Sequence, residues 1–248
     1  MNRLKGKRAL ITGGSSGIGL ETAKQFIVEG ARVAITGHSD KSFETARKEF
    51  GDAVLYITSD AADVVGQKKV AEIIKQQFEG LDALFVNAGV TELKPVEQWD
   101  ETAFDRSFHT NVRGPFFLIQ ALLQLFSNPA SIILNASINA HIGMPNTSVY
   151  GATKGALLSL ARTLSGELIP RGIRANAISP GPIATPLYTK LGLSTADLKA
   201  TSEALQGQLP IKRFGKPSEI ASAVVFLASD ESAFTVGSEL IVDGGLGL

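Results

Sequence analysis

A glycine-rich turn between a short apolar run and an amphipathic segment constrains the fold of this chain more than any other feature. The turn is Thr12-Gly-Gly-Ser-Ser-Gly-Ile-Gly19. The run before it, residues 8–12, has the length and apolar character of a buried parallel strand, and residues 18–29 have the periodicity of an amphipathic helix that ends at Gly30. A strand, a glycine turn and a helix in this order predict the first unit of a parallel α/β sheet.

The glycines of this turn have separate physical roles in such a unit. Gly13 permits a tight turn, Gly17 lets the backbone approach a pyrophosphate, and Gly19 lets the helix pack closely on the strand. The unpaired N–H groups at the helix N-terminus then face the phosphates. The glycine spacing alone is also compatible with a plain structural turn, but the strand before it and the helix after it favour dinucleotide binding.

Further short apolar runs alternate with helix-length segments along the rest of the chain. They are residues 31–36, 53–57, 83–86, 131–134, 173–178 and 239–242. This alternation predicts a single-domain α/β fold over residues 1–248, with a doubly wound parallel sheet of about seven strands and helices on both faces. A chain of 248 residues, 44% of them hydrophobic, can bury such a core in one domain.

Glycine and polar residues directly follow most of these runs. In open parallel sheets, ligands bind beyond the carboxyl ends of the strands, so these residues are candidates for a binding edge. They are Gly13, Gly37, Asp60, Asn87, Ser137 and Pro180.

Tyr150 and Lys154, in the sequence Tyr-Gly-Ala-Thr-Lys, form a candidate acid–base pair. On one helix the four-residue spacing puts both side chains on one face, so the ammonium can favour the phenolate form of the tyrosine. A cation about 4 Å away supplies on the order of 4 kcal/mol at an effective dielectric of about 20, before losses. Ser137 adds a neutral hydroxyl donor for a substrate oxygen. The Tyr–Lys spacing alone is also compatible with an ordinary solvated helix face.

The composition limits the classes of partner. Lys plus Arg and Asp plus Glu number 24 each, so no net field concentrates nucleic acid or an acidic membrane surface. The absence of cysteine excludes disulfides, thiolate catalysis and cysteine metal sites, and nothing in the sequence resembles a metal cluster. No apolar run has the length of a signal segment or of a membrane span. We therefore expect a cytoplasmic protein without nucleic-acid, membrane or metal partners.

Taken in order, the motifs resemble those of the short-chain dehydrogenase/reductase family, above all its 3-oxoacyl-carrier-protein-reductase-like branch. The motifs are Thr12-Gly-x-x-x-Gly-x-Gly19, Asn87-Ala-Gly89, Asn111, Ser137, Tyr150-x-x-x-Lys154, Pro180-Gly181 and Val242-Asp243-Gly244-Gly245. The resemblance covers essentially all 248 residues. It implies a Rossmann fold, reversible hydride transfer between a nicotinamide dinucleotide and a small-molecule carbonyl or alcohol, and a substrate lid at about residues 186–210. It also implies a homotetramer, paired through a helical segment at residues 104–126 and the helix after Tyr150.

The resemblance further implies the site residues. Ser137 would hold the carbonyl oxygen and Tyr150 would donate the proton. Lys154 would assist that proton transfer and bind the nicotinamide ribose, and the main chain of Asn111 would hold a water of the proton relay. The cofactor-binding residues that it implies are Gly13, Ser15, Ser16, Gly17, Ile18, Gly19, Gly37, His38, Ser39, Asp60, Ala61, Asn87, Ala88, Gly89, Tyr150, Lys154, Pro180, Gly181, Ile183 and Thr185.

A local feature bears on Asn111. In a helix, the N–H of residue 115 bonds the carbonyl of residue 111, but residue 115 is proline and has no N–H. The carbonyl of Asn111 therefore needs another partner, which suits the relay water. Gly114-Pro115 is equally compatible with a simple kink in a long helix.

The end of the second predicted strand bears on the choice between NADP(H) and NAD(H). A site for the unphosphorylated dinucleotide usually places an acid there, whereas this chain has Thr36-Gly37-His38-Ser39. Without an acid the pocket tolerates a 2′-phosphate, with His38, Ser39 and Lys41 as donors, so NADP(H) is preferred. NAD(H) stays an alternative, because His38 replaces the family's arginine and Asp40 can reach the ribose if the loop is shifted.

These inferences together predict an NADP(H)-dependent oxidoreductase that reduces ketones or 3-oxoacyl compounds. One alternative is an NAD-dependent alcohol or sugar dehydrogenase. Another is a nicotinamide-binding sensor without catalysis, against which the intact Asn, Ser, Tyr and Lys set argues.

Overall fold

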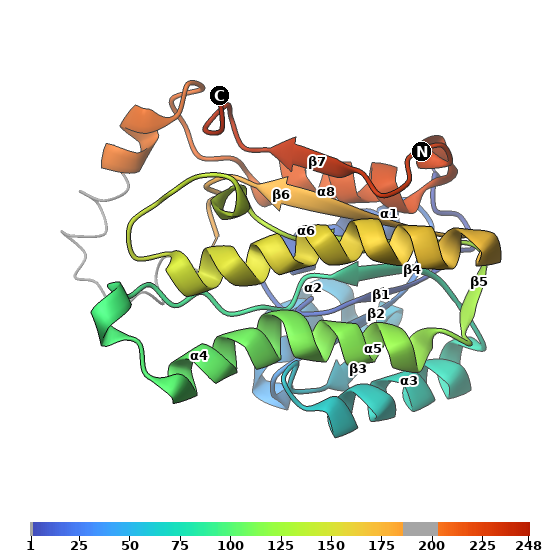
Figure 1. Ribbon diagram of the computed structural model, residues 1–248. Coiled ribbons are helices and arrows are strands. Elements are labelled where there is room, and N and C mark those ends of the chain that lie inside the picture. The colour runs from blue at the N-terminus through green and yellow to red at the C-terminus, as the bar shows by residue number, and fades with distance from the viewer. Residues whose placement is uncertain (1, 186–202) are drawn as a thin grey trace.

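The computed structural model of the chain describes residues 2–185 and 203–248. Its centre is a parallel sheet of seven strands in the order β3-β2-β1-β4-β5-β6-β7 (Figure 1). The strands are β1 (Arg8–Ile11), β2 (Arg32–Gly37), β3 (Val54–Thr58), β4 (Leu81–Val86), β5 (Phe126–Asn135), β6 (Ile173–Pro180) and β7 (Glu239–Val242). This sheet confirms the predicted fold class. The strand order reverses between β1 and β4, which is where open α/β sheets bind their ligands.

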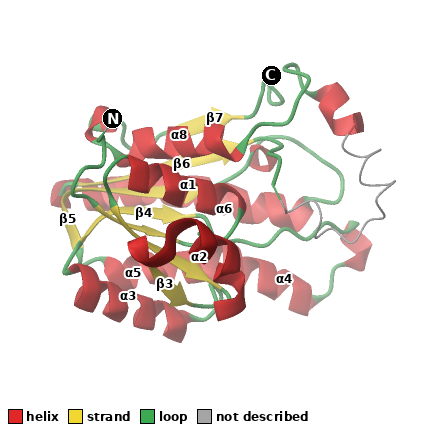
Figure 2. Ribbon diagram, turned by 180° about the vertical axis from the view of Figure 1, so that it is seen from behind, coloured by secondary structure: helices red, strands yellow, loops and turns green. Residues whose placement is uncertain are grey.

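Helices cover both faces of the sheet. The α-helices that flank it are α1 (Gly17–Val28), α2 (Glu44–Phe50), α3 (Val64–Phe78), α4 (Glu101–Phe108), α5 (Gly114–Leu122), α6 (Ser148–Leu168) and α8 (Pro217–Ala228). Apolar residues of α3, α5 and α6 pack on the face nearer the viewer in Figure 1. Those of α1 and α8 pack on the opposite face, which Figure 2 shows from behind. The sheet is therefore doubly wound, as the alternation of apolar runs predicts.

Each face of the sheet buries its own apolar cluster. In β5, Ile132 and Leu134 belong to the cluster beneath α3, α5 and α6, whereas Ile133 belongs to the cluster beneath α1 and α8. All three are fully buried. Successive residues of a strand point to opposite faces, so a strand covered on both sides is apolar throughout rather than alternating.

Two strands begin earlier than the apolar pattern predicts. Strand β4 begins at Leu81 and β5 at Phe126, where the sequence indicates residues 83 and 131. Leu81 pairs with Phe126, and the register shifts between Leu81 and Ala83. Backbone pairing across this irregularity extends both strands beyond the residues that a continuous apolar run identifies.

The helix expected over residues 104–126 is divided in the structure. Helix α4 ends at Phe108, His109–Arg113 form a π-helical turn, and α5 begins at Gly114. The N–H of Gly114 donates to the carbonyl of His109, five residues earlier, as in a π-turn. Phe126 lies in β5, so its inclusion in the helical segment is wrong. The lid expected at about 186–210 falls outside the described residues over 186–202.

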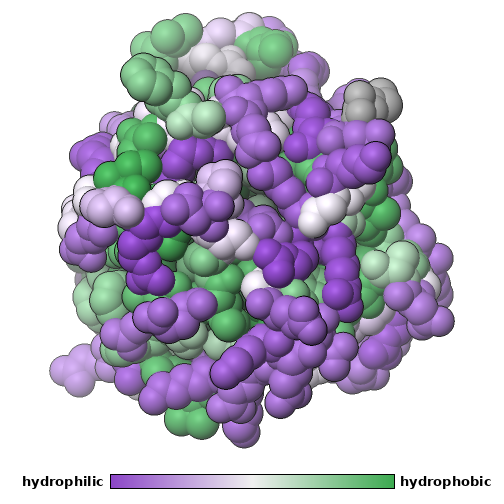
Figure 3. All heavy atoms as spheres, turned by 90° about the vertical axis from the view of Figure 1, so that its right-hand side faces the viewer, coloured by the Kyte–Doolittle hydropathy of each residue, from purple (hydrophilic) through white to green (hydrophobic). Residues whose placement is uncertain are grey.

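Hydrophilic residues predominate on the side of the molecule where the strands begin (Figure 3). Several ion pairs lie there, among them Lys7 with Asp230 and Arg8 with Asp82, each at 2.8 Å. Arg8 also donates to the hydroxyl of Ser127 at 2.7 Å. These contacts join the first strand to later parts of the chain at the end of the sheet opposite the predicted binding edge.

Glu29, which follows α1, should make the stability of the fold depend on pH. The Arg3 guanidinium and the backbone N–H groups of Asn2 and Arg3 donate to its carboxylate and lower its pKa to about 2. Because its usual pKa is about 4.3, this stabilisation is complete above that pH and is lost as the pH falls toward 2. We expect the free energy of unfolding to fall as the pH is lowered from about 4.3 to about 2. In Glu29→Gln the free energy of unfolding should depend less steeply on pH over the same range. Chemical unfolding at a series of pH values measures both, and equal pH slopes in the two proteins would contradict the expectation.

Candidate active site

The glycine turn has the conformation that close approach of a phosphate requires. Gly13 and Gly17 have φ of 63° and 55°, which side chains other than glycine rarely adopt. A β-carbon on Gly19 would collide with the carbonyl oxygen of Gly13, so helix α1 can pack this closely only with glycine there. Ser16 precedes α1 without a side-chain capping bond, and its side chain is exposed. The turn thus leaves an open backbone cradle at a helix N-terminus, which fits a dinucleotide pyrophosphate.

Thr12, a residue that sequence reasoning did not assign to the site, ties this turn to the end of β4. Its hydroxyl accepts from the backbone N–H groups of Asn87 and Ala88, each at 2.9 Å. The side-chain amide of Asn87 donates in return to the carbonyls of Thr12 and Gly13 at 3.0 and 3.2 Å. The predicted Asn87-Ala88-Gly89 motif therefore lies against the glycine turn, at the point where the strand order reverses.

The acid–base pair lies on one face of α6, as its spacing predicts. Lys154 is 5% exposed, and its Nζ lies 5.6 Å from the centre of the Tyr150 ring. The ammonium donates to the carbonyl of Asn135, at the end of β5, at 2.6 Å. The Lys154 side chain is thus anchored by a backbone carbonyl at the end of β5 and lies beside the Tyr150 ring.

Ser137 lies just beyond the end of β5 and is 6% exposed. Its hydroxyl donates to Oδ1 of Asn139 at 3.3 Å and accepts from the N–H of Asn139 at 3.2 Å. The side chain of Asn139 in turn approaches the sulfur of Met144 at 3.7 Å. Asn139 is a further residue that the motifs did not identify. The long bond from Ser137 to Asn139 is one that a substrate oxygen can replace.

Asn111 lies in the π-turn between α4 and α5 and is 1% exposed. Its side chain accepts from the N–H of Val90 at 2.8 Å and donates to the carbonyl of Val90 at 2.9 Å and to the hydroxyl of Thr153 at 3.1 Å. A β-carbon added to Gly89 would lie 3.1 Å from Oδ1 of Asn111 and 3.8 Å from Nζ of Lys154. Asn111, Gly89 and Lys154 therefore converge at one point.

The ribose end of the predicted cofactor site is open at the end of β2. His38 and Ser39 are exposed. Gly37 is packed so closely that a β-carbon would lie 2.7 Å from the ring of Phe43. Asp40 is held by Arg47 through two hydrogen bonds, at 2.8 and 3.0 Å, which lowers the pKa of its carboxyl group. The acid that the sequence analysis considered for the ribose is thus bound to a neighbouring arginine.

Four further predicted cofactor residues lie at the same edge with different degrees of access. The side chain of Thr185 lies against Gly17, since a β-carbon there would be 3.4 Å from its methyl group. The N–H of Gly181 donates to the carbonyl of Val242 at 3.0 Å. The Asp60 carboxylate accepts from the N–H of Ala62 at 2.9 Å. Ile183 is 6% exposed and belongs to the core beneath α1 and α8, so only its backbone can face a ligand.

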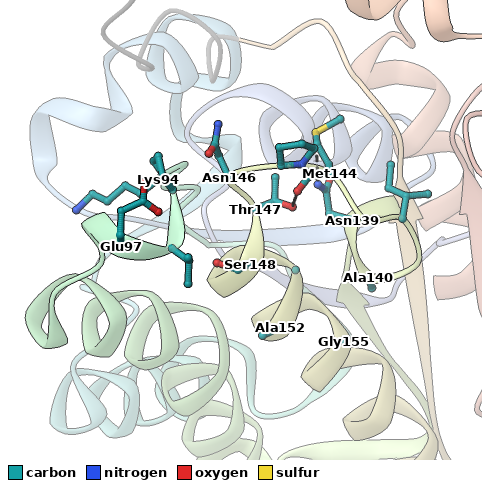
Figure 4. A pocket seen from close by; sticks show the side chains of 16 residues that line it. Lys94, Glu97, Asn139, Ala140, Met144, Asn146, Thr147, Ser148, Ala152 and Gly155 are labelled. Atoms are coloured by element: carbon teal, nitrogen blue, oxygen red, sulfur yellow. Dashed lines mark hydrogen bonds between the residues drawn. The ribbon is translucent and has the colours of Figure 1, made fainter.

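An open pocket of about 760 Å³ borders this site (Figure 4). Figure 4 shows Asn139, Met144 and Thr147 close together on one wall, with Lys94 and Glu97 on another. Small residues of α6 complete it, namely Ser148, Gly151, Ala152 and Gly155. Adjacent helix positions are turned by about 100°, so this face of α6 is not the face of the acid–base pair. The pocket therefore adjoins the candidate acid–base pair without being formed by it.

Within residues 2–185 and 203–248, no group of three or more His, Asp or Glu side chains is placed to hold a metal ion. In the same part of the chain, no helix combines the length and apolar character needed to cross a bilayer.

Comparison with known proteins agrees with this geometry. A family model described as enoyl-(acyl carrier protein) reductase matches residues 13–247. The NADP-dependent (R)-specific alcohol dehydrogenase of Lentilactobacillus kefiri is 36% identical over 253 residues, which cover 98% of this chain and 98% of that protein. A solved glucose/ribitol dehydrogenase from Brucella melitensis, a short-chain dehydrogenase/reductase, has a TM-score of 0.92 at 32% identity and covers 99% of this chain and 98% of its own. L-Sorbose reductase from Gluconobacter frateurii, solved with NADPH and L-sorbose, has a TM-score of 0.93 at 33% identity, with coverage of 100% and 99%.

Fold and relatives together define an oxidoreductase that uses a nicotinamide dinucleotide on alcohol or carbonyl groups. The chain belongs to the short-chain dehydrogenase/reductase family, as its motifs predicted.

Proposed function

We propose that this enzyme interconverts a ketone or 3-oxoacyl compound and its secondary alcohol, with NADP(H) as the preferred cofactor. The observation that carries the proposal is the buried Lys154 ammonium, 5.6 Å from the centre of the Tyr150 ring and bonded to the neutral carbonyl of Asn135. Such a cation stabilises a phenolate, and proton transfer to a carbonyl oxygen leaves a phenolate behind.

In this proposal each residue has a distinct task. The nicotinamide, when bound, supplies the hydride in reduction and accepts it in oxidation. The Tyr150 hydroxyl donates its proton to the substrate oxygen, while the Ser137 hydroxyl exchanges its long bond to Asn139 for one to that oxygen. Lys154 has three N–H donors, of which one is used by Asn135, so two stay available for a ribose hydroxyl and a relay water.

The role proposed for Asn111 is confined to its main chain. Its side chain is engaged with Val90 and Thr153, so it cannot also hold a relay water by its amide without giving up one of these bonds. Its carbonyl loses the usual helical donor at Pro115. We infer that this carbonyl binds the water that returns a proton to Tyr150 through Lys154.

The alternative is an NAD-dependent alcohol or sugar dehydrogenase. A glucose/ribitol dehydrogenase and an L-sorbose reductase among the similar structures support its sugar substrate, whereas the reductase, solved with NADPH, does not support its cofactor. A spectrophotometric assay separates the two. NADPH and NADH are each followed at their absorbance with acetoacetyl thioesters, aliphatic and aromatic ketones, diketones and keto-sugars. Consumption with ketones or thioesters supports the proposal, whereas activity confined to NADH and keto-sugars replaces it with the alternative.

We expect NADPH to bind more tightly than NADH, by about tenfold. His38 and Ser39 are exposed donors at the end of β2, and the Asp40 carboxylate is bound to Arg47 rather than presented to a ribose hydroxyl. The alcohol dehydrogenase of L. kefiri is named as NADP-dependent, and the L-sorbose reductase was solved with NADPH. Titration of cofactor fluorescence measures both affinities, and His38→Ala should weaken NADPH alone. Tighter binding of NADH would overturn the assignment.

We also propose a cytoplasmic homotetramer. Phe104 on α4 and Phe116 on α5 are 43% and 41% exposed, although both are large apolar side chains. The family resemblance pairs these helices and α6 between subunits, which would cover the two rings. Light scattering of the purified protein gives the mass in solution, and a monomer would contradict the proposal.

A further inference from the structure

The segment after the edge strand β7 lies against the turn that carries Ser137. A β-carbon on Gly247 would lie 2.8 Å from Cδ1 of Ile138, which directly follows Ser137 and is 2% exposed. The Asp243 carboxylate shapes the segment by accepting from the N–H groups of Gly245 and Gly247 at 2.9 and 2.7 Å. Gly244 and Gly245 have φ of 68° and 85°, so the course of this backbone depends on glycine.

The same segment packs on the residues that follow the gap in the described chain. The N–H of Ile211 donates to the carbonyl of Gly244 at 3.3 Å. A β-carbon on Gly244 would lie 2.7 Å from Ile211, and one on Gly245 would lie 3.1 Å from Pro210. Figures 1 and 2 both show the C end beside the short helix at residues 203–208. Residues 243–248 therefore lie between the 209–211 backbone and the Ser137 turn.

Strand β7 holds the other end of that turn. The ring of His141 contacts the Glu239 carboxylate at 2.6 Å, and the buried Ser179 hydroxyl donates to the same carboxylate. The backbone N–H of His141 closes the turn on the carbonyl of Ile138 at 2.9 Å. One edge of the sheet thus fixes the Ser137 turn at both its ends, through Ile138 and through His141.

We propose that residues 243–248 are a positioning element for the substrate: by holding Ile138 they set where the Ser137 hydroxyl meets the substrate oxygen. This inference rests on the proposed function, because it takes Ser137 as the residue that holds that oxygen. Gly247 makes the closest approach in this contact, since a β-carbon there would lie 2.8 Å from the terminal methyl group of Ile138 and 3.2 Å from Oδ2 of Asp243. The element acts on substrate orientation and leaves the glycine turn, where the cofactor phosphates are expected, untouched.

The test is a double-mutant cycle of Gly247→Ala and Ile138→Val. Gly247→Ala adds a β-carbon, and Ile138→Val removes Cδ1, the methyl group that this β-carbon would meet. We expect Gly247→Ala to lower kcat/KM about tenfold, mainly through KM, because small displacements of a positioning group have large kinetic effects. The enantiomeric ratio of the alcohol should change with it. Affinity for NADPH should not change, and the double variant should regain kcat/KM to within about twofold of the wild type. Gly166→Ala is the matched control, because Gly166 lies far along α6 with open space at its β-carbon position.

The outcomes separate this inference from the proposed function. An active Gly247→Ala enzyme with wild-type KM and enantiomeric ratio would overturn the inference alone. A loss that Ile138→Val fails to repair would also overturn it, since the effect would not pass through Ile138. A wild-type chain that binds NADPH but turns over no carbonyl compound would remove the proposed function, and this inference with it.

Discussion

Replacing Tyr150 with phenylalanine is expected to lower kcat by about 10³-fold, the central part of the range for loss of a general acid. The variant keeps the ring on α6 and removes only the oxygen that would donate the proton. Lys154 keeps its bond to the carbonyl of Asn135, because that bond does not involve the phenol. NADPH affinity should therefore stay close to that of the wild type, so the loss appears in turnover and not in cofactor binding.

Tyr56→Phe is a matched control for this experiment. The Tyr56 hydroxyl donates to the carbonyl of Gly51 at 2.8 Å, so its loss removes a phenol oxygen outside the acid–base group. We expect that control to cost about 1 kcal/mol of stability and to leave kcat unchanged. Steady-state kinetics and thermal unfolding on the three proteins measure both quantities. A Tyr150→Phe enzyme with kcat within tenfold of the wild type would refute the assignment of Tyr150 as the acid.

The parts of the site that the sequence could predict are those governed by local geometry. Gly13 follows a strand, and Gly17 and Gly19 lie in the first turn of a helix. Their spacing together with these flanking elements predicts a backbone cradle, which the structure has. Tyr150 and Lys154 are one helical turn apart, so a correct helix assignment brings them to one face. The alternation of apolar runs similarly fixes the sheet, because buried parallel strands must be continuously apolar.

Contacts between distant segments could not be predicted in this way. The Thr12 hydroxyl binds residues 75 and 76 positions away, and His141 contacts Glu239 across 98 positions. The periodicity of apolar residues indicates local secondary structure and does not identify such distant partners. The π-turn at Asn111 was also missed. The missing N–H of Pro115 shows only that one helical hydrogen bond is lost, not which geometry replaces it. The chain at Gly114 also packs so closely on Ala61 that a β-carbon there would collide with the Ala61 carbonyl, and this contact depends on a loop far earlier in the chain.

Asn111→Leu is expected to lower both stability and turnover, and the structure shows why the two effects must be separated. Leucine has nearly the same size but leaves the N–H and carbonyl of the partly buried Val90 without their side-chain partners. Unsatisfied groups cost about 1–3 kcal/mol each when they are fully buried, and because Val90 is only partly buried we expect a total loss of about 2 kcal/mol. Because the π-turn carries the proposed relay carbonyl, loosening it should also lower kcat in the molecules that stay folded.

The variant Thr153→Val distinguishes a loss of the proposed proton relay from a loss of stability alone. It removes one partner of the Asn111 amide and leaves both bonds to Val90, so it should cost about 1 kcal/mol while kcat stays within a few-fold of the wild type. Turnover is measured at a temperature where unfolding curves show each variant fully folded, together with NADPH affinity by fluorescence. We expect kcat of Asn111→Leu to fall by about 10²-fold with a much smaller loss of NADPH affinity, which is the pattern for a blocked proton path. Wild-type turnover in folded Asn111→Leu would refute this prediction, because it would show that the Asn111 side chain is not needed to hold the relay carbonyl in place.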